Sequence, residues 1–172
     1  YNEQVQIDGN ALTGPSATNT ITFRSASANA ANVTVTDNTS NISDNYTWLV
    51  RDLSHVRFEN ITVENTSPAP YQRVMQFESL NAPMEDLRLE NSIFRGAPNP
   101  PSSSSNYANL FMDHSAFPLV DVEIVNNDIN GGSSGINFGN ASTVSRDVFI
   151  SQNTFRNAGG LSVINLQEVH DF

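Results

Sequence analysis

An eight-residue pattern that returns four times along the chain constrains the fold more than any other feature of the sequence. Each copy reads apolar, any, apolar, any, Asn or Gln, any, any, apolar, and the copies begin at Val56, Leu87, Val122 and Val148. The two alternating apolar residues indicate a half-buried strand, and the last apolar residue turns inward again after a polar corner. Successive copies lie 31, 35 and 26 residues apart, which is the length of one coil of a solenoid.

A second series of short alternating segments falls between these copies, at residues 48–50, 75–77, 110–112, 136–138 and 164–166. Segments at 5–7, 21–23 and 33–35 give an earlier coil in the same style. An antiparallel sandwich would need hairpins, whereas here the same pattern returns in the same direction after a full coil. We therefore predict one all-β domain over residues 1–172, a parallel solenoid of about six coils.

Stacking the repeats places equivalent residues above one another, about 4.8 Å apart along the axis. This alignment predicts an inner apolar column and, at the corner beside it, a polar column. The inner column contains Phe58, Leu89, Ile124 and Ile150, and the polar column contains Asn60, Asn91, Asn126 and Gln152. We expect the polar column to be a buried structural ladder, because stacked amides can donate and accept hydrogen bonds from coil to coil.

These Asn-bearing coils resemble the right-handed parallel β-helix superfamily, which includes pectate lyases and polygalacturonases. The segments 1–7 and 17–25 also resemble the first coils of β-helix modules in large secreted proteins of environmental bacteria. The resemblance implies a right-handed β-helix truncated at both ends, a bacterial extracellular or cell-surface location, and remaining domains of a parent protein as partners. No catalytic residue is carried over, because the sequence has no lysine, no Asp-Asp pair and neither family's signature.

The charge of the chain limits its partners. It carries eight arginines, no lysine and 18 acidic residues, for a formal net charge of −10. Such a surface repels nucleic acid, and no apolar run approaches the roughly 20 residues needed for membrane insertion, so we expect neither partner. Acidity without lysine also suits a saline habitat, a hypothesis that equal thermal stability in low and molar salt would contradict.

Charged residues of the second strand series provide the candidate catalytic group. The alignment places Arg51, Glu78 and Asp113 at one position of successive coils, with His114 directly after Asp113. Carboxylates beside Arg and His could act as acid and base, and Glu78 and Asp113 could bind calcium. A solvated ion-pair ladder is the alternative interpretation. A second column, Arg57, Arg88 and Glu123, is predicted to stabilise its sheet face through complementary pairs.

Outward-facing aromatic residues are candidates for carbohydrate binding, since an apolar ring can stack on a sugar. Phe111 and Phe149 fall in the outward phase of their strands, whereas Trp48 shares the inward phase of Met75 and is predicted to be core. The Pro- and Ser-rich insert at 96–106 lengthens one coil and is expected to form an exposed loop.

Two classes of function remain open at the sequence level. The first is a non-catalytic module of a secreted or cell-surface protein with a carbohydrate-binding, adhesive or structural role. The alternative is a fragment of a polysaccharide lyase or glycoside hydrolase acting on an acidic, plant or algal polysaccharide. The unpaired strands expected at the two ends further predict end-to-end self-association.

Overall fold

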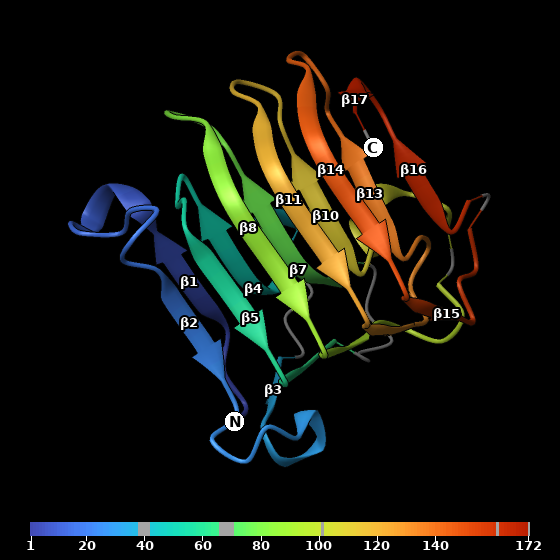
Figure 1. The fold of residues 1–172 in the computed structure, drawn as a ribbon. Helices are drawn as coiled ribbons and strands as arrows, with labels where there is room; N and C mark the ends of the chain where they lie inside the picture. The colour runs from blue at the N-terminus through green and yellow to red at the C-terminus, as the bar shows by residue number, and fades with distance from the viewer. Residues whose placement is uncertain (38–41, 66–70, 101, 161, 172) are drawn as a thin grey trace.

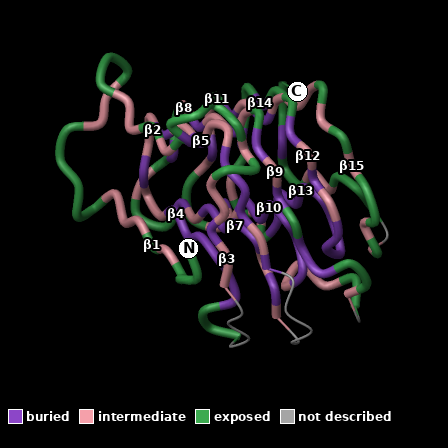
Figure 2. The backbone as a smooth tube through the Cα atoms, turned by 90° about the horizontal axis from the view of Figure 1, so that it is seen from below, coloured by how far each residue is buried: buried purple, intermediate pink, exposed green. Residues whose placement is uncertain are grey.

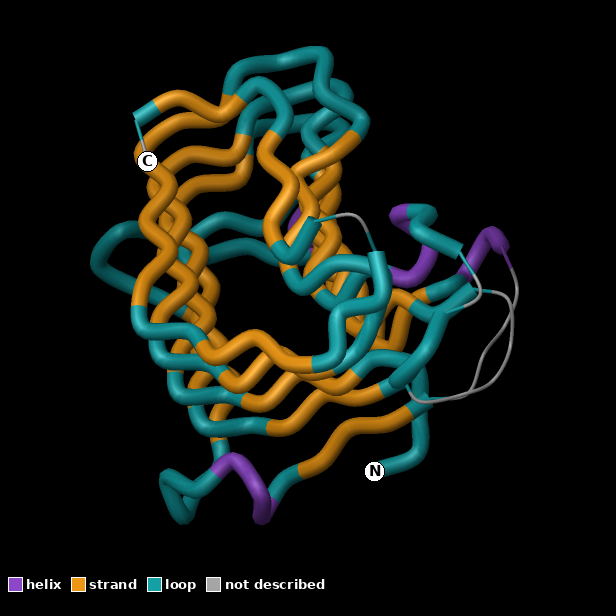
Figure 3. Tube along the Cα trace, turned by 90° about the vertical axis from the view of Figure 1, so that its right-hand side faces the viewer, coloured by secondary structure: helices purple, strands orange, loops and turns teal. Residues whose placement is uncertain are grey.

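The computed structural model describes residues 1–37, 42–65, 71–100, 102–160 and 162–171. Over these residues the chain forms a right-handed parallel β-helix, as predicted, with three parallel sheets running along its axis (Figure 1). Seen along that axis, the coils stack so that equivalent strands lie above one another (Figure 3). The solenoid therefore presents side chains either to its interior or to one of three outer faces.

Each of the first five coils contributes one strand to each of the three sheets, and the last coil contributes described strands to two of them. Sheet I contains β1 (Val5–Asp8), β4 (Tyr46–Arg51), β7 (Arg73–Glu78), β10 (Leu110–Asp113), β13 (Ile136–Gly139) and β16 (Ile164–Leu166). Sheet II contains β2 (Ile21–Arg24), β5 (Val56–Glu59), β8 (Met84–Glu90), β11 (Leu119–Val125), β14 (Ser145–Ser151) and β17 (Val169–His170). Sheet III contains β3 (Thr34–Thr36), β6 (Thr62–Glu64), β9 (Ile93–Arg95), β12 (Asp128–Asn130) and β15 (Thr154–Arg156).

The inner columns follow the predicted register. Leu89 pairs with Phe58 on one side and with Ile124 on the other, and Ile124 pairs with Ile150. Phe58, Leu89 and Ile124 are fully buried. Ile150 is partly buried and packs against the same core. Burial is greatest in the middle coils and falls in the connecting loops (Figure 2).

Trp48 lies in the core, as its phase predicts, and is only 6% exposed. Its ring contacts Phe23 and Phe58 edge-on, with centroids 5.2 Å away in both cases, and Phe23 and Phe58 stack on each other. Edge-to-face and offset-stacked pairs are the favoured aromatic geometries, so this cluster stabilises the first coils beyond its burial alone.

The polar corner column differs from the prediction in its burial. Asn60, Asn91, Asn126 and Gln152 have φ between 52° and 57° and lie at least partly exposed. Asn tolerates this left-handed conformation better than most residues, so residues at these positions allow the backbone to turn as it leaves sheet II. The column keeps one amide contact, from Asn126 Nδ2 to Asn91 Oδ1 at 2.8 Å. The expectation that it is buried is wrong.

The buried ladder lies one residue further along, at Ser92 and Asn127, which are buried, and it continues to Asn153, which is half-buried. Asn127 Oδ1 accepts from the Ser92 backbone N–H at 2.9 Å, and Asn153 Oδ1 accepts from the Asn127 N–H at 2.9 Å. The amide nitrogens donate inward to carbonyls of the preceding strands, from Asn127 to Leu89 at 2.8 Å and from Asn153 to Ile124 at 2.7 Å. These bonds satisfy backbone groups that leave the sheet at the corner.

The remaining regular elements are four short 3₁₀ turns, η1 (Gly9–Ala11), η2 (Ala30–Asn32), η3 (Ile42–Asp44) and η4 (Ser105–Tyr107), in the part of the chain that is described. None of the described helices has the length and apolarity needed to cross a membrane. The turn η4 lies in and just after the Pro/Ser insert, of which Pro101 is outside the described residues. The outer part of the insert is exposed, whereas Gly96 and Ala97 are buried at its base.

Candidate functional site

The predicted charged column exists at the end of sheet I. Arg51 pairs in register with Glu78, and Glu78 with Asp113. Arg51 donates to Glu78 Oε2 from Nε at 2.8 Å and from Nη2 at 2.7 Å, and Gln76 donates to the other oxygen. The carboxylate of Glu78 is thus fixed in place by an arginine and an amide.

His114 does not join Glu78 and Asp113 on the outer face of sheet I. Asp113 accepts from the Ser115 N–H at 3.0 Å and from Asn140 Nδ2 at 2.8 Å. The His114 side chain is fully buried, with its ring edge-on to Phe138 at 6.0 Å. Burial lowers the pKa of His114, so the ring is neutral near pH 7. The predicted catalytic grouping of His114 with Glu78 and Asp113 is wrong, because the ordinary alternation of side chains along β10 places the residue after Asp113 in the interior.

Phe111 points outward as its phase predicts but offers no exposed platform. Its ring is fully buried, and the Arg73 guanidinium lies over it at 3.7 Å from the centroid. Arg73 also donates to the Ser105 carbonyl at 3.0 Å and so ties the turn η4 to this face. Burial lowers the pKa of Arg73 to about 10, which leaves it charged at neutral pH. Phe111 therefore belongs to a packed cation–π contact.

Calcium does not fit the Glu78 and Asp113 pair. Calcium takes six to eight oxygen ligands, whereas both carboxylates here already accept hydrogen bonds from protein donors. Among the described residues no group of three or more His, Cys, Asp or Glu side chains is placed to hold a metal ion.

The outer face of sheet II is more open. One row crosses four strands through Arg57 on β5, Arg88 on β8, Glu123 on β11 and Phe149 on β14. Arg88 Nη1 pairs with Glu123 Oε2 at 3.1 Å, as predicted for this column. Phe149 is 57% exposed, a high value for a large apolar side chain in a strand. At about 4.8 Å per strand the row spans about 14 Å.

A hollow of about 470 Å³ lies on this face, lined in part by His55, Arg57, Asp86, Arg88, Asp121 and Arg146. Asp86 organises it: one carboxylate oxygen contacts His55 Nδ1 at 3.2 Å, and the other lies 3.5 Å from Arg88 Nε and 3.9 Å from Arg57 Nη2. Arg146 belongs to β14, the strand that carries Phe149. The hollow thus places fixed donors and acceptors on the same sheet face as the exposed Phe149 ring, which does not itself line the hollow.

Three residues that line this hollow, His55, Asp86 and Asp121, lie just before the predicted repeats and were not predicted as site residues. His55, Asp86, Asp121 and Asp147 all have φ between 53° and 58° and directly precede the first apolar residue of each repeat. A repeat pattern extended by one residue toward the N-terminus predicts this second column of left-handed positions, since Asp is one of the few residues enriched in the left-handed conformation.

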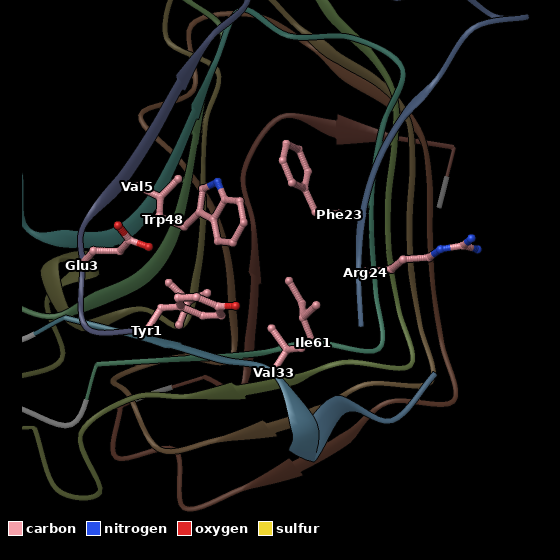
Figure 4. A pocket seen from close by; sticks show the side chains of 9 residues that line it. Tyr1, Glu3, Val5, Phe23, Arg24, Val33, Trp48 and Ile61 are labelled. Carbon is pink, nitrogen blue, oxygen red and sulfur yellow. The ribbon is translucent and has the colours of Figure 1, made fainter. Parts of the chain in front are cut away.

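A second hollow, of about 230 Å³, opens at the N-terminal end of the solenoid. Val5, Phe23, Val33, Trp48 and Ile61 point into it, while Arg24 points away (Figure 4). It is the open end of the hydrophobic core, because the strands that line it belong to the first coils and carry inward-phase side chains. Its lining is mainly apolar and is suited to packing against another coil.

Comparison with known proteins adds no family to this picture. No protein-family model, no curated protein and no solved structure matches the chain.

Proposed function

We propose that this chain is a non-catalytic, glycan-binding β-helix module of a secreted or cell-surface protein, and that its binding face is the outer surface of sheet II. The observation that carries the proposal is the exposed ring of Phe149 in a row with Glu123 and Arg88. Exposed aromatic rings suit the apolar faces of sugars. Guanidinium groups donate and carboxylates accept, so the neighbouring hollow offers partners to sugar hydroxyls.

The charge of this face bears on the kind of glycan. The hollow contains three arginines, but Glu85, Asp86 and Asp121 line it as well. The local charge is therefore close to balanced, and no unpaired cationic patch selects for an anionic polymer. A recognition role is also favoured over catalysis at the predicted sheet I column, because Glu78 is committed to Arg51 and His114 is buried.

The test is binding and turnover on a polysaccharide array, followed by calorimetry on any glycan that binds. Replacing Phe149 by Ala should weaken binding about threefold to tenfold, the size of an aromatic contact. Ile42→Ala is the matched control, because Ile42 is 60% exposed on a different part of the surface. New reducing ends or unsaturated products would contradict the non-catalytic role, and binding indifferent to Phe149→Ala would contradict the assigned face.

A further inference from the structure

A separate pocket of about 320 Å³ lies at the corner between sheet III and sheet I. It is lined by Ser103 of the insert, Ser133 and Ser134 of the turn between β12 and β13, Asn137 of β13, and Ser162 and Asn165 at β16. All six side chains end in a hydroxyl or an amide, and none of these lining residues is ionisable. The pocket thus differs in chemistry from the charged hollow on sheet II.

The walls of the pocket are fixed by hydrogen bonds across coils. Ser133 donates from its N–H to the Tyr107 carbonyl at 2.8 Å and from Oγ to the Ser104 carbonyl at 2.7 Å. These bonds fasten the turn to the end of the Pro/Ser insert. A Cβ at Gly160 would lie 1.9 Å from the Ser133 carbonyl oxygen, so the backbone of the next coil also approaches closely. The lining is pre-formed, which reduces the ordering cost of binding.

Ser134 supplies the observation that points to a ligand. Its side chain is buried, the residue being only 5% exposed, and its Oγ has no hydrogen-bond partner among the described residues. Buried polar atoms nearly always have a partner, and leaving a hydroxyl unpaired is unfavourable. Asn137 and Asn165 also line the pocket from adjacent strands, and Asn165 Nδ2 donates a hydrogen bond to Asn137 Oδ1 at 3.3 Å.

We propose that this pocket binds an uncharged, polyhydroxylated unit, a neutral monosaccharide either free or as part of a glycan. Hydroxyls and amides both donate and accept, so they match neighbouring sugar hydroxyls, one of which would satisfy Ser134 Oγ. A uronate is disfavoured, because its carboxylate would lose water without gaining a cationic partner. The inference extends the proposed function by naming a sugar class, at a site that shares no residue with the sheet II row.

The test uses glucose, galactose and mannose against glucuronate and galacturonate, by saturation-transfer NMR and calorimetry on the full chain. At least one neutral sugar should bind, and Ser134→Ala should weaken it about threefold to tenfold, the fold-change of one hydrogen bond. Ser142→Ala is the matched control, since Ser142 is exposed on a turn outside the pocket. Asn137→Asp is a second variant that adds a charge and should weaken neutral sugars further.

Each outcome decides between the two sites. If the affinity for a neutral sugar is lower in Ser134→Ala and unchanged in Phe149→Ala, the result supports the pocket, irrespective of polysaccharide binding on sheet II. Binding that depends on Phe149 but not on Ser134 overturns the pocket and leaves the proposed function standing. Equal or tighter binding of the uronates overturns the inference, as does the absence of binding by all three neutral sugars.

Discussion

Replacing Asn127 by Ala should destabilise the protein strongly, because this side chain joins three coils. Its amide accepts from the Ser92 N–H and donates to the Leu89 carbonyl and to Asn153 Oδ1. Three hydrogen bonds at about 1 kcal/mol each, plus about 1 to 2 kcal/mol for leaving the buried Ser92 N–H unpaired, give a loss of about 4 to 5 kcal/mol. For a chain of this size that corresponds to a melting temperature lower by roughly 10 °C or more.

The neighbouring residue provides the control. Asn126→Gly keeps the left-handed backbone, which has φ 54°, and removes one exposed amide contact, so it should cost less than about 1 kcal/mol. Urea unfolding would be followed by far-UV circular dichroism and by the fluorescence of Trp48, the single tryptophan, which is buried. Coincident transitions would justify a two-state analysis. Equal losses in the two variants, or a larger loss in Asn126→Gly, would refute the assignment of the buried ladder.

Two further predictions concern acid stability and assembly. Burial alone would raise the pKa of Asp52, but hydrogen bonds from Asn81, Asn10 and the Leu80 N–H outweigh it and lower that pKa. Because its pKa is lower in the folded state, the ionised Asp52 carboxylate stabilises the protein above the unfolded pKa of about 4. This contribution is lost as the pH falls through the folded-state pKa. The difference in unfolding free energy between wild type and Asp52→Asn should therefore shrink from pH 7 to pH 3 in urea titrations. End-to-end association of two copies should raise the mass seen by sedimentation as concentration increases, because β16 and β1 are the two edges of sheet I. Ile164→Asp should abolish it, since Ile164 is 36% exposed in the inward phase, and a wild type that stays monomeric at high concentration would contradict it.

The fold was predictable because the interior of a solenoid repeats. Every coil must place an apolar residue at the same inner position, so the alignment of Phe58 with Leu89 and Ile124 in the sequence predicts their pairing in the structure. The same logic gave the register of Arg51 with Glu78 and the core position of Trp48. Inward and outward phases along regular strands follow from the two-residue period of the backbone.

The corners and the outer faces were not predictable in this way. A left-handed residue resets the phase, so the amide that lies in the interior is Asn127 rather than Asn126, although both are asparagines. The burial of Phe111 depends on Arg73, 38 residues earlier in the chain, and the pattern of one strand contains no information about that contact.

The buried ladder and the exposed row are parts of the same coils, and this links stability to the proposed function. Ser92, Asn127 and Asn153 follow β8, β11 and β14, the three strands that carry Arg88, Glu123 and Phe149 in that order. A ligand lying across the row contacts side chains from several coils, so it depends on the spacing and register that the ladder holds. The inner positions must remain apolar in every coil for packing, whereas the outer row changes from arginine to glutamate to phenylalanine without altering the register. The outer row is therefore where the sequence of this solenoid is free to specify a ligand.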